Sequence, residues 1–370
     1  MSDDDETSQR GDGGPASDKR KGGQFFAVDK QRWIQVCNAG LNEAVAYLVL
    51  ACFSGKTNAN TAASVHALET YTGISRSRAK EAIDSLKTLH LIRQTRGGSH
   101  PRYDLLPPGQ HGTGGPKSKP GEAAADNWIW LPNTLVTGAA SECPPVESVR
   151  QTQKLGSLRL FVELYDASNL RDDGGISRRL VFRKYHRERL GQQAGYVVWG
   201  FIQDCDHVFS DAPHARPYKR DLTVAEKSDG KNQSAGFWET YRALETLGLI
   251  ETVSYLWESE DDDAEPMHPY QAGPLDCIET RIGLAAHQAG AALLTPGQVK
   301  HASAKGLWLA PVREHRERVA MVGIKRLRYR PKTRKTGAWW AELQRTGAKW
   351  LDVYQRVIAE RTDATQSRSA

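Results

Sequence analysis

The chain of 370 residues lacks a long apolar run: the longest, 44–53, has about half of the ~20 residues that a membrane-spanning helix needs. The first residues are mostly acidic, with no apolar core of a secretory signal, so we expect no such signal. Cysteine is scarce, and the five thiols lie far apart with no Cys-x-x-Cys pair. This pattern argues against a disulfide framework and predicts a cytoplasmic protein without membrane association.

Motifs of enzymes and metal sites are missing or incomplete. Residues 54–57 (SGKT) end like a phosphate-binding loop, but Leu50 stands where the first glycine is required. Cys205, His207 and His214 are candidate zinc ligands, although scattered residues of these types usually belong to the core or the surface. We therefore expect no enzymatic activity, no metal and no cofactor.

The charge of the chain is concentrated rather than spread. The formal net charge is +6, and residues 313–361 hold fourteen basic and five acidic residues, an excess of nine. The rest of the chain is therefore slightly acidic, at −3. A concentrated basic segment favours a polyanionic partner such as nucleic acid, while a solvated basic face is the alternative.

Segments rich in charge, glycine or proline divide the chain. We expect tails at 1–24 and 362–370, a linker at 107–122 (the breaker-rich run begins at Pro107) and an acidic, proline-containing linker at 258–274. Three blocks remain, at 25–106, 123–257 and 275–361.

The first block has the pattern of three helices and a hairpin. Residues 41–53 and 62–71 predict helices, and Thr72-Gly73-Ile74 predicts a turn. Ser75 is a candidate N-cap for a third helix to residue 90, with an apolar stripe through Ala79, Ile83 and Leu86. Residues 91–95 and 102–105 predict strands around the tip 96–101.

Over about fifty residues, and most sharply at 68–92, this block is similar to the reader module of bacterial winged-helix regulators of the GntR and MarR type. It implies that the helix after Ser75 enters the major groove of double-stranded DNA and that the hairpin is the wing. Winged helices can also bind proteins instead of DNA. The DNA-binding residues expected in this block are Ser75, Arg76, Ser77, Arg78, Lys80, Lys87, Arg96, His100 and Arg102.

Residues 237–250 repeat the pattern of 79–92, with a helix that leads into a strand, and 158–170 match the opening helix. A long insertion at about 171–230 makes this second unit degenerate. Trp238, Glu245 and Glu251 stand where the first copy has Lys80, Lys87 and Arg93. Dimerisation or packing is therefore as good an interpretation as a second DNA contact.

The third block predicts a helix at 281–294, strands at 307–312 and 319–329, and a final helix at 336–361. A run of basic and aromatic residues joins the last strand to that helix and favours phosphate or minor-groove contact. The residues expected to bind DNA there are Lys325, Arg326, Arg328, Arg330, Lys332, Arg334 and Lys335. An ordinary charged loop is the alternative.

A tyrosine recombinase is a remote alternative. His315-Arg316-Glu317-Arg318, Trp340 and Tyr354 have the order of that family's catalytic residues, but the tetrapeptide recurs at 186–189.

These patterns together predict an α+β protein with two winged-helix-like units, the second degenerate, and a basic C-terminal block of strands and a helix. Tandem units of this kind resemble the replication initiators of plasmids and phages. We expect a sequence-specific protein that binds double-stranded DNA, as an initiator or as a regulator of a mobile element. A transcriptional regulator that dimerises through its C-terminal region and a protein-interaction scaffold remain alternatives, and a homodimer is left open.

Overall fold

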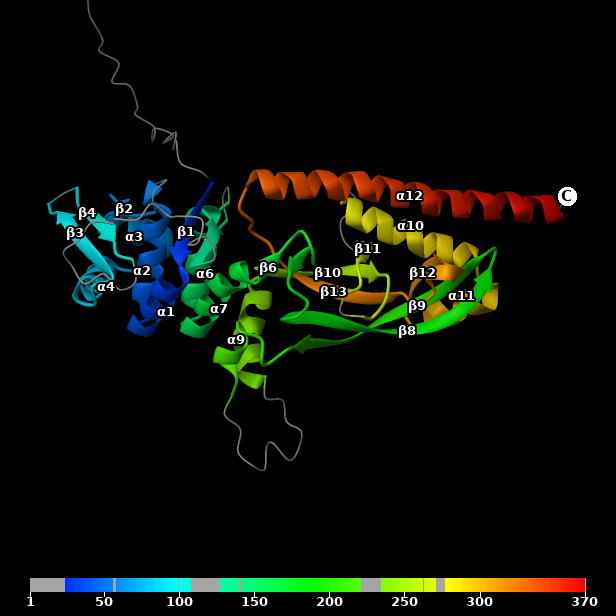
Figure 1. The fold of residues 1–370 in the computed structure, drawn as a ribbon, viewed down its shortest axis with the longest axis horizontal. Coiled ribbons are helices and arrows are strands. Elements are labelled where there is room, and N and C mark those ends of the chain that lie inside the picture. The colour runs from blue at the N-terminus through cyan, green and yellow to red at the C-terminus, as the bar shows by residue number, and fades with distance from the viewer. Residues whose placement is uncertain are drawn as a thin grey trace, which may run out of the picture.

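A computed structural model of the chain describes residues 24–55, 58–98, 100–107, 127–139, 142–220, 234–261, 263–270 and 277–369. Helices and antiparallel sheets are mixed, which confirms the expected α+β class. The molecule is elongated, with the N-terminal elements at one end and a long C-terminal helix along one side (Figure 1). Among these residues, no helix combines the length and the apolar character that a bilayer crossing requires.

The N-terminal part contains three helices followed by a hairpin, preceded by a strand and a helix. Its elements are β1 (Phe25–Asp29), α1 (Lys30–Ala39), α2 (Leu41–Cys52), β2 (Asn60–Thr61), α3 (Val65–Thr72), α4 (Arg76–Thr88), β3 (Ile92–Arg96) and β4 (Arg102–Leu105). α2 is buried on all sides from Ala44 onward, as its apolar sequence requires. β2, β4 and β3 form an antiparallel sheet in that order. The helices and strands expected in this block are confirmed to within three residues.

The middle of the chain contains short helices and a long hairpin. Its elements are β5 (Trp128–Pro132), α5 (Thr134–Thr137), α6 (Pro145–Gln151), α7 (Leu155–Asp166), β6 (Ser168–Asn169), β7 (Gly175–Ile176), β8 (Val181–Gln193), β9 (Tyr196–Val208), η3 (Arg216–Tyr218), α9 (Ala235–Thr246) and β10 (Ile250–Trp257). The β8–β9 hairpin lies within the insertion. Its turn holds Ala194 at φ +52° and Gly195 at +74°, which is the left-handed pair of a two-residue hairpin turn.

The C-terminal part completes the large sheet and covers it. Its elements are β11 (Pro266–Pro269), α10 (Ile278–Ala292), α11 (Pro296–Ala304), β12 (Trp308–Arg313), η4 (Glu314–Arg316), β13 (Ala320–Leu327) and α12 (Arg334–Ser369). Two expectations are corrected here. β11 lies inside the expected linker 258–274, at a sheet edge where prolines are tolerated because one side of the strand needs no N–H partner. α12 continues through the expected tail to Ser369.

The large sheet has six antiparallel strands in the order β11-β10-β13-β8-β9-β12, so both later blocks contribute to it. β10 pairs with β13 along its whole length, from Ile250 opposite Leu327 to Trp257 opposite Ala320. The expected helix-then-strand order is present as α9 and β10. β10 is nevertheless an interior strand rather than part of a free wing, because five consecutive residues, 253–257, are buried. The tip between β10 and β11 is acidic, with Glu258, Glu260 and Asp261.

Two large cores hold the molecule together. One runs without interruption from β1 through α2, α4, α6 and α7 to α9. The other packs α10 and α12 against one face of the six-stranded sheet, including Val198, Leu309 and Met321. β1 also pairs with β5, so the N-terminal block is joined directly to the residues after the expected linker. That linker lies outside the described residues except for Pro107.

Candidate nucleic-acid interface

Helix α4 presents a polar surface because its apolar residues all point inward. Ala79, Ala82, Ile83 and Leu86 are buried against the N-terminal core. Ser75 occupies the N-cap position with extended backbone angles, but its side chain makes no capping hydrogen bond, contrary to the expectation. The stability of α4 therefore depends more on tertiary packing than on capping of its first turn.

The basic side chains of α4 divide between two flanks. At about 100° per residue, Arg76, Lys80 and Lys87 lie on one flank and Arg78 on the other. Lys87 Nζ lies 3.4 Å from Gln94 Oε1 of β3, so the first flank faces the hairpin. The same ammonium lies 2.6 Å from Asp84 Oδ1, so Lys87 is already engaged.

The first turn of α4 is the most accessible part of this surface. The side chain of Arg76 is 77% exposed, with Nη1 3.5 Å from Glu69 Oε2. Ser77 Oγ donates to a carboxylate oxygen of Glu81 at 3.1 Å. Arg78 and Lys80 are exposed, and among the described residues neither side chain has a polar partner. These two cations are therefore available without breaking an existing contact.

The β3–β4 hairpin extends this surface. Arg96, His100 and Arg102 are exposed along its far end, as a wing would require. Nearer the core, Arg93 Nη2 lies 2.7 Å from Asp104 Oδ2 and ties the two strands together. The structure thus brings together the expected residues of the first block on α4 and the adjoining hairpin.

The turn between α3 and α4 is held by a residue that the sequence does not single out. Arg150 of α6 donates from Nε to the carbonyl oxygen of Thr72 at 2.6 Å and from Nη2 to that of Gly73 at 3.3 Å. Gly73 has φ +62°, and a Cβ there would lie 2.7 Å from Glu147 Oε1. No local sequence signal reveals this contact, because Arg150 is 78 residues away from Thr72 along the chain.

The basic run that ends β13 does not form one surface, which corrects the expectation for two of its residues. Lys325 is 0% exposed, and its ammonium lies 2.9 Å from Asp206 and 3.0 Å from Glu245. Burial alone would raise the pKa of Asp206, but hydrogen bonds from Arg183 and Lys325 hold it below its usual value. The Lys325 side chain is buried within the fold and cannot reach a phosphate.

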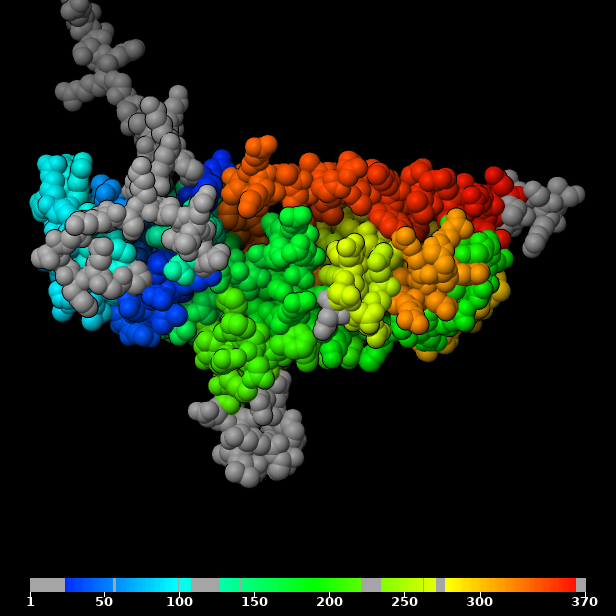
Figure 2. Space-filling model, in the orientation of Figure 1, coloured from blue at the N-terminus to red at the C-terminus, as the bar shows by residue number. Residues whose placement is uncertain are grey.

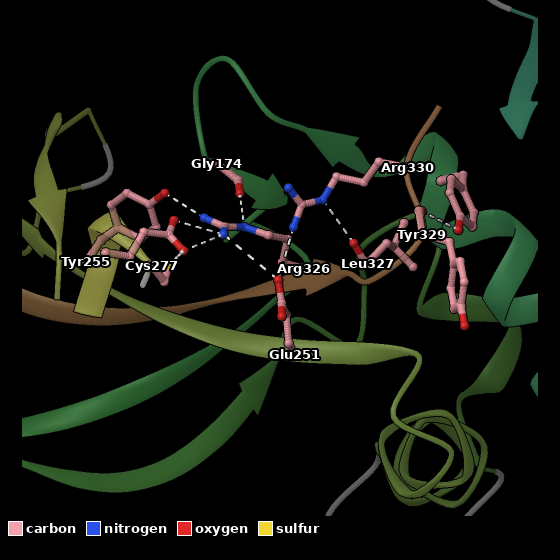
Figure 3. A network of polar contacts seen from close by, with 10 residues as sticks. Gly174, Glu251, Tyr255, Cys277, Arg326, Leu327, Tyr329 and Arg330 are labelled. Atoms are coloured by element: carbon pink, nitrogen blue, oxygen red, sulfur yellow. Dashed lines mark hydrogen bonds and ion pairs between the residues drawn. The ribbon is translucent and has the colours of Figure 1, made fainter. Parts of the chain in front are cut away.

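Arg326 is the centre of a buried polar network (Figure 3). Its side chain is 1% exposed, with Nη1 2.9 Å from Glu279 Oε1. It also donates to the carbonyl oxygen of Gly174 at 2.9 Å and to the hydroxyl of Tyr255 at 2.7 Å. These contacts engage the guanidinium inside the fold, so Arg326 has a structural role and is not the free cation that the sequence suggested.

The remaining basic residues of this run are accessible in different degrees. Arg328 pairs with Glu142 at 2.8 Å, and Arg330 with Glu251 at 3.0 Å. Lys332, Arg334 and Lys335 are exposed at the start of α12. They lie toward the middle of the molecule, whereas α4 and its hairpin lie at one end (Figure 1). The two expected basic sets are therefore separate surfaces.

Glu245 and Glu251, which stand where the first copy has basic residues, form ion pairs within the protein. Glu245 binds Lys325 of β13, and Glu251 binds Arg330 just after this strand, although the side chain of Glu251 stays 44% exposed. Their role is internal pairing, which agrees with the packing interpretation of this unit.

Tyr354 and the candidate zinc ligands have structural partners. The Tyr354 hydroxyl is 2.7 Å from His268 Nε2 in the second core, where burial raises the pKa of the phenol. His214 pairs with Asp166 at 2.9 Å, and His207 packs on Phe209. Within the described ranges, no group of three His, Cys, Asp or Glu residues could hold a metal ion.

Comparison with known proteins adds no relative. No protein-family model, curated protein or solved structure matches the chain. The function must therefore be argued from the geometry and charge of the molecule itself.

Proposed function

We propose that this protein binds double-stranded DNA in a sequence-specific manner through α4 and the β3–β4 hairpin, which together act as a winged helix-turn-helix. α4 enters the major groove and the hairpin follows the adjacent backbone. The observation that carries the proposal is the combination of exposed, unengaged cations on α4 with further cations on the hairpin.

The order of elements supports this assignment. α2, β2, α3, α4, β3 and β4 follow one another as in a winged helix, and the short β2 closes the sheet beside β4. The turn before α4 is rigid, since Gly73 has left-handed backbone angles and Arg150 binds two of its carbonyl groups. A fixed turn suits a helix that must approach base edges at a constant angle.

The side chains support a division between base and phosphate contacts. Arg76 and Arg78 lie in the first turn of α4, where an arginine can donate two hydrogen bonds to guanine O6 and N7. Lys80, Arg96 and Arg102 are suited to phosphates, which position the protein without reading sequence. Lys325 and Arg326 have no part in this interface.

Whether the protein initiates replication or regulates a mobile element follows from the arrangement of its binding sites on DNA. Initiation of replication and regulation of a mobile element both require such a reader. We propose to recover the bound sites by selection from random duplex DNA. Tandem direct repeats favour an initiator, and an inverted repeat beside a promoter favours a dimeric regulator.

The test of the interface uses the selected site and a scrambled duplex. Arg76→Ala or Arg78→Ala is expected to weaken binding to the selected site by about 1–3 kcal/mol, with a much smaller loss on scrambled DNA. Arg356→Ala is the matched control, since Arg356 is another exposed arginine in a weak ion pair, with Asp352 on α12. It should bind both duplexes like the unmodified protein.

Two results would count against this function. If both arginine variants lose equal affinity on both duplexes, α4 does not read bases. If selection enriches no sequence and binding does not depend on salt, the protein-interaction alternative is the better one.

A further inference from the structure

A large cleft lies where β5 meets the start of α12, away from α4. Its volume is about 890 Å³, and its walls come from β5, the end of α7 and the chain after it, the end of β13 and the chain after it, and the first turns of α12. A groove of about 450 Å³ continues from it and shares Leu170, Arg330 and Trp339. Figure 2 shows the start of α12, in orange, on the side of the molecule toward the N-terminal part.

Tryptophan is concentrated here. Trp128, Trp130 and Trp339 line the cleft, and Trp340 lines the groove. In the described part of the chain, seven large apolar side chains are exposed; two are tryptophans, Trp130 at 46% and Trp340 at 40%, and both belong to this site. Phe25 supports the Trp130 ring through a T-shaped contact at 5.4 Å. Exposed and braced aromatic rings of this kind are typical of a surface that binds flat ligands.

The charges around the cleft leave cations in excess. Asp166 is engaged by Lys30 at 2.8 Å and by His214, and Glu342 is engaged by Arg345. By contrast, the side chains of Arg171 and Lys335 have no polar partner among the described residues, although both line the cleft.

Arg330 connects the cationic and aromatic parts. Its guanidinium lies 5.7 Å from the ring centre of Trp339 and 5.6 Å from that of Trp340. Lys332 extends the positive charge along the groove. Aromatic rings and cations therefore share the walls of both the cleft and the groove.

We infer that this cleft and groove bind unpaired nucleotides of single-stranded DNA. Bases stack on Trp130 and Trp339, and the phosphates between them meet Arg171, Lys332 and Lys335. Stacking accepts any base, because every base has a π-face, and a basic groove follows the backbone. A duplex keeps its bases inside and offers none to a tryptophan. This inference does not rest on α4, and it would hold if α4 did not read DNA.

The test uses the full chain and fluorescein-labelled oligothymidine of twelve nucleotides, with binding followed by fluorescence anisotropy. Trp130→Ala is expected to weaken binding about ten-fold. Phe209→Ala is the matched control, because Phe209 is 44% exposed but lies elsewhere, and it should bind like the unmodified protein. Trp130→Phe keeps a π-face and should recover most of the affinity, which separates stacking from any loss of folding.

The phosphate contact is tested by charge reversal. Lys335→Glu is expected to weaken binding. It should also reduce the slope of the logarithm of the binding constant against the logarithm of the salt concentration, by more than the ~0.7 expected for one phosphate contact on a single strand. Lys349→Glu places the same change on the same helix, about 21 Å farther along at 1.5 Å per residue, and should have little effect.

Two further experiments identify the ligand and distinguish this site from the α4 surface. Thymidine monophosphate should fail to displace the oligonucleotide at millimolar concentration; full displacement would overturn the strand assignment in favour of a free nucleotide. Arg78→Ala should leave oligothymidine binding unchanged. The inference fails if the unmodified protein does not bind the oligonucleotide, or if Trp130→Ala binds like Phe209→Ala.

Discussion

Replacing Arg326 by methionine is expected to lower the free energy of unfolding by about 3–5 kcal/mol, as when one partner of a buried ion pair is removed. The change removes the guanidinium but keeps an unbranched apolar chain of similar reach. Glu279, which is only 3% exposed, then keeps a buried carboxylate without its cation. The carbonyl of Gly174 and the hydroxyl of Tyr255 each lose a hydrogen bond from the same side chain.

The magnitude can be checked with a second substitution. Arg326→Met with Glu279→Met removes both charges, so the double variant should be about 1–3 kcal/mol more stable than Arg326→Met alone. Arg328→Met is the control in the same segment. Arg328 is half exposed in its pair with Glu142, so its loss should cost less than about 1 kcal/mol.

Urea unfolding at pH 7, followed by circular dichroism and tryptophan fluorescence, measures these differences. The reasoning is refuted if Arg326→Met and Arg328→Met have the same stability. It is also refuted if the second substitution at Glu279 destabilises the protein further, because the carboxylate would then not be the source of the cost.

Three more predictions follow from buried or remote contacts. Burial lowers the pKa of His268 from an ordinary 6.5 to about 4, so its stability contribution is complete above pH 6.5 and is lost as the pH falls toward 4. At pH 4 this loss in the free energy of unfolding reaches about 3 kcal/mol. Urea unfolding should therefore show that His268→Gln loses less stability between pH 7 and pH 4.5 than the unmodified protein. Arg150→Ala should weaken binding to the selected duplex about ten-fold by freeing the turn before α4, while oligothymidine binding stays unchanged in the anisotropy assay. Tyr354→Phe should keep all DNA binding and form no covalent adduct with DNA, as seen on denaturing gels; an adduct lost in this variant would support a recombinase.

The sequence by itself determined α2, α3, α4 and the β3–β4 hairpin of the N-terminal part, but not β1, α1 or β2. The apolar stripe of α4 and the breakers on either side of β3 and β4 are short-range patterns, and packing did not override them. The α+β class and the positions of α10, β12 and β13 also followed from such patterns. Periodicity was enough for α4 because this helix buries one face, whereas the continuous apolar run of α2 marks a helix that is buried on all sides.

Only the tertiary structure decided which charges are free. Lys325 and Arg326 look like their neighbours in the sequence, yet their acidic partners Glu245 and Glu279 are 80 and 47 residues away. Glu245 lies on α9 and Glu279 on α10, and no local pattern encodes how these helices lie against β13. The cleft of Trp130 and Trp339 likewise exists only because β5 and α12 meet in space. A side chain's burial and its partners depend on long-range contacts, which a single sequence does not display.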